Sequence, residues 1–200
     1  MPFYRRLGET GKQIVIPKVL QARYRFRGLW VIVTFSTFAM FILASENSIS
    51  LKIGKKLSAA GKTLAIAESC TGGYISHLIT SVPGSSAYYL GGIISYHNKI
   101  KKEELTVRKK TLKKYGAVSA ECASEMALGI KKEFDVNFSL ATTGIAGPTG
   151  SVPGKPVGTV YIALAYKKNI IVERFNFKGT RLEIIKQTAQ TALEMLYKVL

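Results

Sequence analysis

Two short apolar runs, each followed directly by a loop of small residues, constrain the fold of this chain more than any other feature. The first run covers residues 63–67 and leads into the segment ESCTGG at 68–73. The second covers residues 138–143 and leads into a glycine- and proline-rich loop at 144–156. Apolar runs of this length are short for helices and indicate buried strands. If both strands run the same way, their loops meet at one edge of a sheet, where α/β proteins bind ligands.

The remaining periodic segments predict the other elements of the fold. Apolar residues at helical spacing predict helices at 49–60, 74–80 and 119–134, a basic helical region at 99–115 with a break at 107–108, and a last helix that starts at a capping box of Thr180 and Glu183. Further strands are expected at 88–96 and in a hairpin of 158–166 and 170–177. Strands and helices in this order predict a three-layer α/β/α sandwich with a mixed sheet.

The first 44 residues differ in composition from the rest of the chain. Residues 2–27 carry seven basic side chains and one acidic residue, Glu9, which leaves +11 of the net charge of +17 to the remainder. Residues 28–44 carry no charge, and these 17 residues are at the lower limit for crossing a bilayer. A membrane anchor, a signal peptide cleaved near Ala44, and non-native sequence upstream of a true start at Met40 all fit this pattern. We therefore expect an N-terminal extension at 1–44 and one globular domain at 45–200, with a membrane as partner only if the apolar segment is genuine.

The inventory of reactive side chains excludes several kinds of site. Asp135 is the only aspartate, and His77 and His97 are the only histidines. An aspartate-rich magnesium site, a pair of catalytic aspartates or a histidine-rich zinc site cannot be built from these residues. Cys70 and Cys122 have no zinc-binding spacing and are expected to be buried thiols in a reducing compartment. We therefore expect neither a bound metal nor a cofactor.

The net charge of +17 points to an anionic partner, which could be a nucleotide, a nucleic acid or a membrane surface. The glycines of 68–73 and 144–147 expose backbone N–H groups that can hold a phosphate, although tight structural turns use the same residues. No motif that reads DNA or RNA accompanies the basic residues between Lys99 and Lys114. A small nucleotide is therefore the expected partner, and nucleic acid is the alternative that the sequence supports less.

Five segments taken together resemble the C-terminal domain family of CinA proteins, the nicotinamide-nucleotide amidases. They read AESCTGG, GSSAYYLGGIISYHNKIK, GAVS, TTGIAGPTG and KPVGTVYIALA, and the resemblance runs from about residue 49 to residue 200. It implies that the domain hydrolyses the carboxamide of nicotinamide mononucleotide to nicotinate mononucleotide and ammonia. It also implies a homodimer, and we expect a cytoplasmic protein. The alternative is a module that binds a nucleotide or a nucleic acid without hydrolysis.

The resemblance also assigns roles in this reaction, which needs a nucleophile, a base and donors for the oxyanion. One aspartate and two histidines supply a Ser-His-Asp triad poorly, and a Ser-Lys dyad is the natural alternative. Matched to the family pattern, Ser86 is the nucleophile and Lys101 the base. Tyr96 is a proton relay or orients the hydroxyl, and Ser69 is the competing nucleophile or a second hydroxyl in the pocket. Two groups are expected to bind the ribose phosphate or the oxyanion: Thr71, Gly72 and Gly73 in the first loop, and Thr143, Gly144, Ile145, Ala146 and Gly147 in the second.

Overall fold

The computed structural model of the chain describes residues 25–26, 29–30 and 48–200. The chain divides into two compact units, Met1–Phe41 and Ile42–Leu200. In the first unit, strands β1 (Arg25–Phe26) and β2 (Leu29–Trp30) form an antiparallel pair. The rest of the segment at 1–44, and with it the choice between an anchor, a signal peptide and a start at Met40, lies outside the described residues. Among the helices that are described, none combines the length and the apolar character needed to cross a bilayer.

The second unit is built on a mixed sheet of five strands in the order β4-β3-β5-β6-β7. The strands are β3 (Leu64–Glu68), β4 (Tyr89–Ile94), β5 (Phe138–Gly144), β6 (Thr159–Tyr166) and β7 (Asn169–Asn176). Strands β4, β3 and β5 are parallel, whereas β6 and β7 continue the sheet in antiparallel fashion. Because Glu68 pairs with Thr142, the loops that follow β3 and β5 leave the sheet at the same edge. The mixed sheet and the shared edge of the two loops, both predicted from the sequence, are confirmed.

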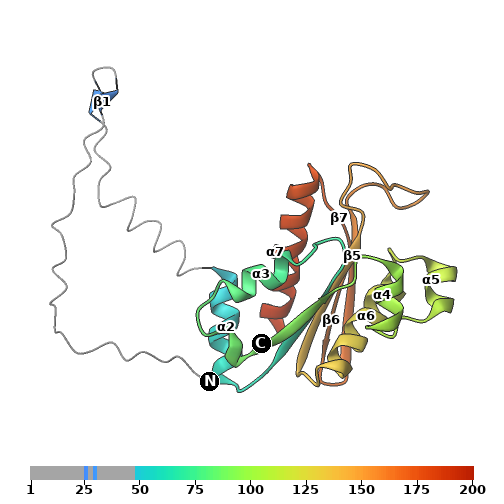
Figure 1. Cartoon of the computed structure of the whole chain (residues 1–200), viewed down its shortest axis with the longest axis horizontal. Helices are drawn as coiled ribbons and strands as arrows, with labels where there is room; N and C mark the ends of the chain where they lie inside the picture. The colour runs from blue at the N-terminus through green and yellow to red at the C-terminus, as the bar shows by residue number, and fades with distance from the viewer. Residues whose placement is uncertain (1–24, 27–28, 31–47) are drawn as a thin grey trace, which may run out of the picture. The chain divides into compact units, whose positions relative to one another are not determined.

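Helices cover both faces of this sheet, so the predicted three-layer sandwich is also confirmed (Figure 1). Helices α2 (Ile49–Ala59), α3 (Tyr74–Thr80) and α7 (Arg181–Val199) pack on one face, and α4 (Asn98–Glu103), α5 (Lys109–Tyr115) and α6 (Ala120–Glu133) lie on the other side. The alternation along β3 explains the arrangement, since successive strand residues point to opposite faces. Leu64 and Ile66 belong to the core under α2, α3 and α7, whereas Ala65 and Ala67 belong to the core under α6.

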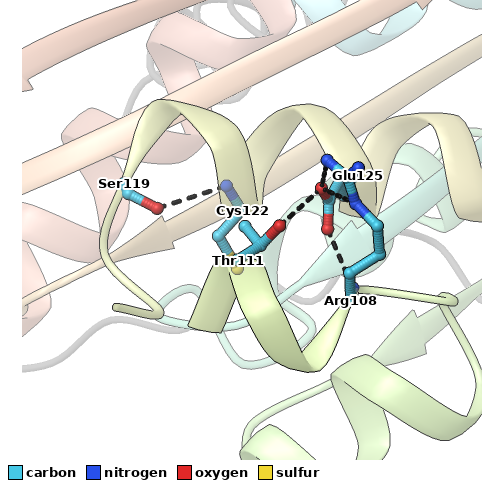
Figure 2. A network of polar contacts seen from close by, with 5 residues as sticks. All are labelled: Arg108, Thr111, Ser119, Cys122 and Glu125. Atoms are coloured by element: carbon cyan, nitrogen blue, oxygen red, sulfur yellow. Dashed lines mark hydrogen bonds and ion pairs between the residues drawn. The ribbon is translucent and has the colours of Figure 1, made fainter. Parts of the chain in front are cut away.

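The basic region expected at 99–115 consists of two short helices, α4 and α5, and a network of polar contacts attaches the start of α5 to α6 (Figure 2). The carboxylate of Glu125 on α6 accepts hydrogen bonds from the backbone N–H and the guanidinium of Arg108 and from the hydroxyl of Thr111. Gly129, one turn further along α6, lies against the backbone carbonyl of Leu105, where a Cβ atom would collide. The segment that leaves α4 is therefore held directly on α6.

Candidate active site

Ser69 and Lys101 form a buried hydrogen-bonded pair at the edge of the sheet where β3 ends. Ser69 is the first residue after β3, and Lys101 projects from the short helix α4. The Lys101 Nζ atom donates to Ser69 Oγ at 2.8 Å and to the carbonyl oxygen of Ser95 at 2.5 Å. Lys101 is only 1% exposed, in contrast to the exposed Lys99 and Lys102 beside it. Of the three lysines at 99, 101 and 102, only Lys101 therefore points into the protein.

Burial lowers the pKa of Lys101 below its ordinary value because the charged ammonium loses its water. The sulfur atoms of Cys122 and Cys70 would oppose this effect only as thiolates. Burial raises the pKa of Cys70 to about 12 and that of Cys122 to about 11, so both remain protonated at neutral pH. A lysine that releases its proton readily and already contacts a serine hydroxyl can act as the base that activates it. Cys70, by contrast, is a packed thiol and not a rival nucleophile.

A cavity of about 360 Å³ opens beside this pair, within the range of pockets that bind small molecules. Its lining includes Ser69, Lys101 and Tyr96 as well as the predicted segment from Thr143 to Gly147. The lining includes the guanidinium of Arg181 and contains no aspartate or glutamate. The cavity therefore suits an anionic ligand that presents a reactive group to Ser69.

Arg181, the first residue of α7, reaches across the mouth of this cavity. Its guanidinium donates to the carbonyl oxygen of Gly147 at 2.7 Å and to the hydroxyl of Tyr96 at 2.7 Å. Sequence reasoning missed Arg181, although the capping box of Thr180 and Glu183 on either side of it was recognised. It also missed other lining residues, namely Asn98, Ala117, Val118, Thr149 and Gly150. The one signal in the sequence was an arginine at the first position of a helix, and this signal is weak.

Within this chain, the structure places Ser86 away from this site, and the predicted pair of Ser86 and Lys101 does not form between residues of one chain. Ser86 is exposed in the short 3₁₀ helix η1 (Ser85–Ala87), which precedes β4. The start of β4 pairs with Leu64 at the start of β3, whereas Ser69 follows the end of β3. The five residues of β3 separate the two positions by roughly 16 Å at about 3.3 Å per residue. Within this chain, the serine beside Lys101 is therefore Ser69.

The first glycine-rich loop, with Thr71, Gly72 and Gly73, lies outside the cavity beside Ser69 and Lys101. These three residues are absent from the lining of the cavity. The backbone N–H groups of Gly73, Ile75 and Ser76 donate instead to the carboxylate of Glu68. The Thr71 hydroxyl is paired with that of Thr142 at 2.8 Å. The N–H groups of Gly72 and Gly73 are thus already bonded within the chain, to the Ser69 carbonyl and the Glu68 carboxylate.

The second loop does face the cavity, but not all of its donors are free. The Thr143 hydroxyl donates to the carbonyl oxygen of Ala117 at 2.8 Å, and the Ile145 N–H donates to that of Thr159 at 2.9 Å. Among the hydrogen bonds of the described residues, none uses the N–H of Ala146 or of Gly147. These two N–H groups are the candidates for binding an oxyanion or a phosphate oxygen. Within the same described part of the chain, no cluster of three or more His, Cys, Asp or Glu side chains could hold a metal ion.

Comparison with known proteins places this chain and its fold in one family. The model of the CinA C-terminal domain matches residues 46–200. A CinA-like protein of Thermotoga neapolitana is 50% identical over 137 residues, which is 68% of this chain and 33% of that protein. The chain spans about a third of the length of the curated relatives it matches.

Two solved structures resemble the second unit closely. The competence/damage inducible protein CihA of Agrobacterium tumefaciens is 38% identical with a TM-score of 0.74, and the match covers 76% of this chain and 93% of that one. A CinA superfamily protein of Klebsiella pneumoniae is 31% identical with a TM-score of 0.73, covering 75% and 94%. The family predicted from the five sequence segments is therefore confirmed, and the chain belongs to the CinA C-terminal domain family.

Proposed function

We propose that this domain is an amidase that hydrolyses the carboxamide of nicotinamide mononucleotide to nicotinate mononucleotide and ammonia. The observation that carries the proposal is the buried contact of 2.8 Å between Lys101 Nζ and Ser69 Oγ at the wall of a basic cavity. A serine activated by a lysine of lowered pKa is suited to attack an amide carbonyl. The choice of nicotinamide mononucleotide as substrate rests on the resemblance of the sequence to the amidase family.

The contacts of the site support a two-step reaction through an acyl-enzyme. In the first step, the neutral Lys101 amine takes the Ser69 proton while Oγ bonds to the carboxamide carbon, and the N–H groups of Ala146 and Gly147 stabilise the oxyanion. The carbon–nitrogen bond then breaks, and the Lys101 ammonium returns the proton to the leaving ammonia. In the second step, water gives a proton to Lys101 and attacks the ester carbon. The ester bond breaks, Ser69 regains its proton and nicotinate mononucleotide leaves.

Arg181 and Tyr96 are assigned to the binding of the phosphate and the orientation of the substrate. Arg181 is exposed at the mouth of the cavity and its guanidinium can exchange the Tyr96 hydroxyl and the Gly147 carbonyl for phosphate oxygens. Tyr96 is 61% exposed and contacts Arg181. Orientation of the nucleotide through Arg181 therefore suits the position of Tyr96 better than proton relay to Ser69 does.

The proposal is tested by ammonia release from nicotinamide mononucleotide by the purified full chain, with and without EDTA. Ser69→Ala and Lys101→Ala should each lower turnover by roughly 10³-fold or more, in the range seen for paired nucleophiles and bases. Ser86→Ala is the matched control, because it makes the same chemical change at an exposed serine outside the cavity. No ammonia from the folded wild-type protein would reject the activity. An inactive Ser86→Ala beside an active Ser69→Ala would reject the assignment of the nucleophile.

A further inference from the structure

Glu68, the last residue of β3, holds a buried carboxylate that turns back onto the start of α3. The residue is 0% exposed. Its Oε2 atom accepts hydrogen bonds from the N–H of Gly73 at 3.0 Å and of Ile75 at 3.1 Å. Its Oε1 atom accepts from the N–H of Ser76 at 2.8 Å and from the Ser76 hydroxyl at 2.7 Å. Four donors from one short stretch of chain therefore converge on a single side chain.

Among the residues that the structure describes, no basic side chain forms an ion pair with this carboxylate. Within residues 48–200, the ion pairs join Lys99 to Glu103 and Arg108 to Glu125, and neither involves Glu68. A buried carboxylate is costly unless hydrogen bonds compensate for its lost hydration. Here the compensation comes from the N–H groups at the start of α3, which favour negative charge. Each carboxylate oxygen accepts two of the four hydrogen bonds, so the side chain of Glu68 is tied to the residues at the start of α3.

Two routes connect Glu68 to the reactive pair. Its side chain spans from the residue before Ser69 to Gly73–Ser76 and so closes the turn that contains Ser69. Its backbone carbonyl accepts from the N–H of Ser95 at 2.7 Å, and the carbonyl of Ser95 in turn holds Lys101 Nζ at 2.5 Å. Movement of Glu68 would therefore displace the nucleophile and the base relative to each other.

We propose that Glu68 is a positioning residue that fixes Ser69 Oγ against Lys101 Nζ, an inference that rests on the proposed function of this pair. A shift of about 1 Å between reacting groups can lower a rate roughly 100-fold, so the effect of losing this contact falls on the chemical step. The hydrogen bonds of the Glu68 carboxylate involve neither Arg181 nor the segment from Thr143 to Gly147, which are assigned to the nucleotide. Positioning thus predicts a fall in kcat with little change in KM.

Glu68→Gln is the test, and Glu133→Gln, the same change at an exposed position on α6, is its control. A glutamine amide presents an N–H₂ group to two of the four donors, so half of the hydrogen bonds are lost. The full-length Glu68→Gln chain should show a kcat lower by roughly 10- to 100-fold and a KM within about threefold of wild type. Glu133→Gln should match wild type in both. A folded Glu68→Gln variant with the kcat of wild type would overturn the proposal, as would a rise in KM alone.

Ser76→Ala is a milder second test, which can be used if Glu68→Gln does not fold. It removes one hydroxyl donor to the Glu68 carboxylate and leaves the backbone donors in place. It should lower kcat by a smaller factor, about 3- to 10-fold, again with KM retained. An unchanged kcat in Ser76→Ala would count against positioning.

A second measurement tests the positioning role of Glu68 independently of the proposed amidase activity. Ser69 is labelled with a fluorophosphonate, which reports the reactivity of the hydroxyl without any nucleotide. Slower labelling of Glu68→Gln than of wild type and Glu133→Gln supports positioning, even if the wild-type protein releases no ammonia from nicotinamide mononucleotide. Equal labelling rates in wild type and folded Glu68→Gln would refute positioning, and so would a wild-type Ser69 that does not react at all.

Discussion

Replacing Gly129 by alanine sets two effects of known size against each other. In the middle of an ordinary helix such as α6, alanine is more stable than glycine by about 1 kcal/mol. At this position the new Cβ would meet the carbonyl oxygen of Leu105, with the carbonyl carbon at 2.7 Å and the Cα at 3.1 Å. These are backbone atoms, which cannot rotate away, so the cost is at the upper end of the range for overpacking, about 3 kcal/mol. The clash should prevail, with a net loss of about 2 kcal/mol.

Thermal unfolding followed by circular dichroism measures this balance. A loss of about 2 kcal/mol lowers Tm by roughly 4–8 °C for a domain of this size. Activity should fall as well, because Leu105 lies just after α4 and the N–H of Val107 is bound to the carbonyl of Lys101 at 3.0 Å. A Tm that rises, as helix propensity alone predicts, would refute the reasoning.

Gly54→Ala is the matched control for the second part of this prediction. Its Cβ would also collide, at 2.7 Å, but with the hydroxyl of Tyr88 in the core beneath α2. Neither Gly54 nor Tyr88 lines the cavity. This variant should lose stability while its folded fraction keeps the kcat of wild type. Equal losses of kcat in both glycine variants would show that destabilisation, and not displacement of Lys101, explains the effect of Gly129→Ala.

Three further predictions concern charge. Because the pKa of Lys101 is lowered by burial and the neutral amine is the base, kcat should rise as pH increases through that pKa, and Lys101→Arg, which cannot deprotonate, should stay inactive across a pH–rate profile. Arg181→Gln should raise KM for nicotinamide mononucleotide by roughly 10- to 100-fold, as expected for loss of a hydrogen bond to a charged group, without affecting nicotinamide riboside, which has no phosphate. For Glu125, burial raises the pKa, but hydrogen bonds from Thr111 and Arg108 outweigh it, and the folded pKa lies below its usual value. The Glu125 carboxylate therefore stabilises the fold fully at pH values above its pKa in the unfolded chain, and this contribution is lost as pH falls through its lower pKa in the folded protein. Urea titrations at neutral and acidic pH should show a smaller fall in the free energy of unfolding for Glu125→Gln than for wild type.

The edge of the sheet that carries the site could be predicted from the sequence, because apolar runs followed by small residues identify where parallel strands end. Lys101 could be named from the family pattern, but its burial could not be foreseen from a run of lysines. The choice between Ser69 and Ser86 depends on the register of β4 against β3. Register is a property of the assembled sheet, and both serines lie in plausible turns of small residues.

Contacts that form only in the folded chain account for the other differences. The glycines of the first loop were expected to bind phosphate because their N–H groups lie at a helix start. The sequence gives no sign that the Glu68 side chain turns back and occupies these donors. Arg181 was missed because it comes to Tyr96 and Gly147 only through the packing of the last helix. In both places, tertiary structure decided which of several polar groups remained free.

The wide spacing of the site along the chain makes its activity a reporter of complete folding. Ser69 comes from the end of β3, Lys101 from the connection after β4, and Arg181 from the start of the last helix. Segments with native helices and strands but without their long-range packing would have normal far-ultraviolet circular dichroism and no assembled cavity. Recovery of turnover after dilution from denaturant therefore requires that β3, α4 and α7 have come together, which recovery of the far-ultraviolet signal alone does not require.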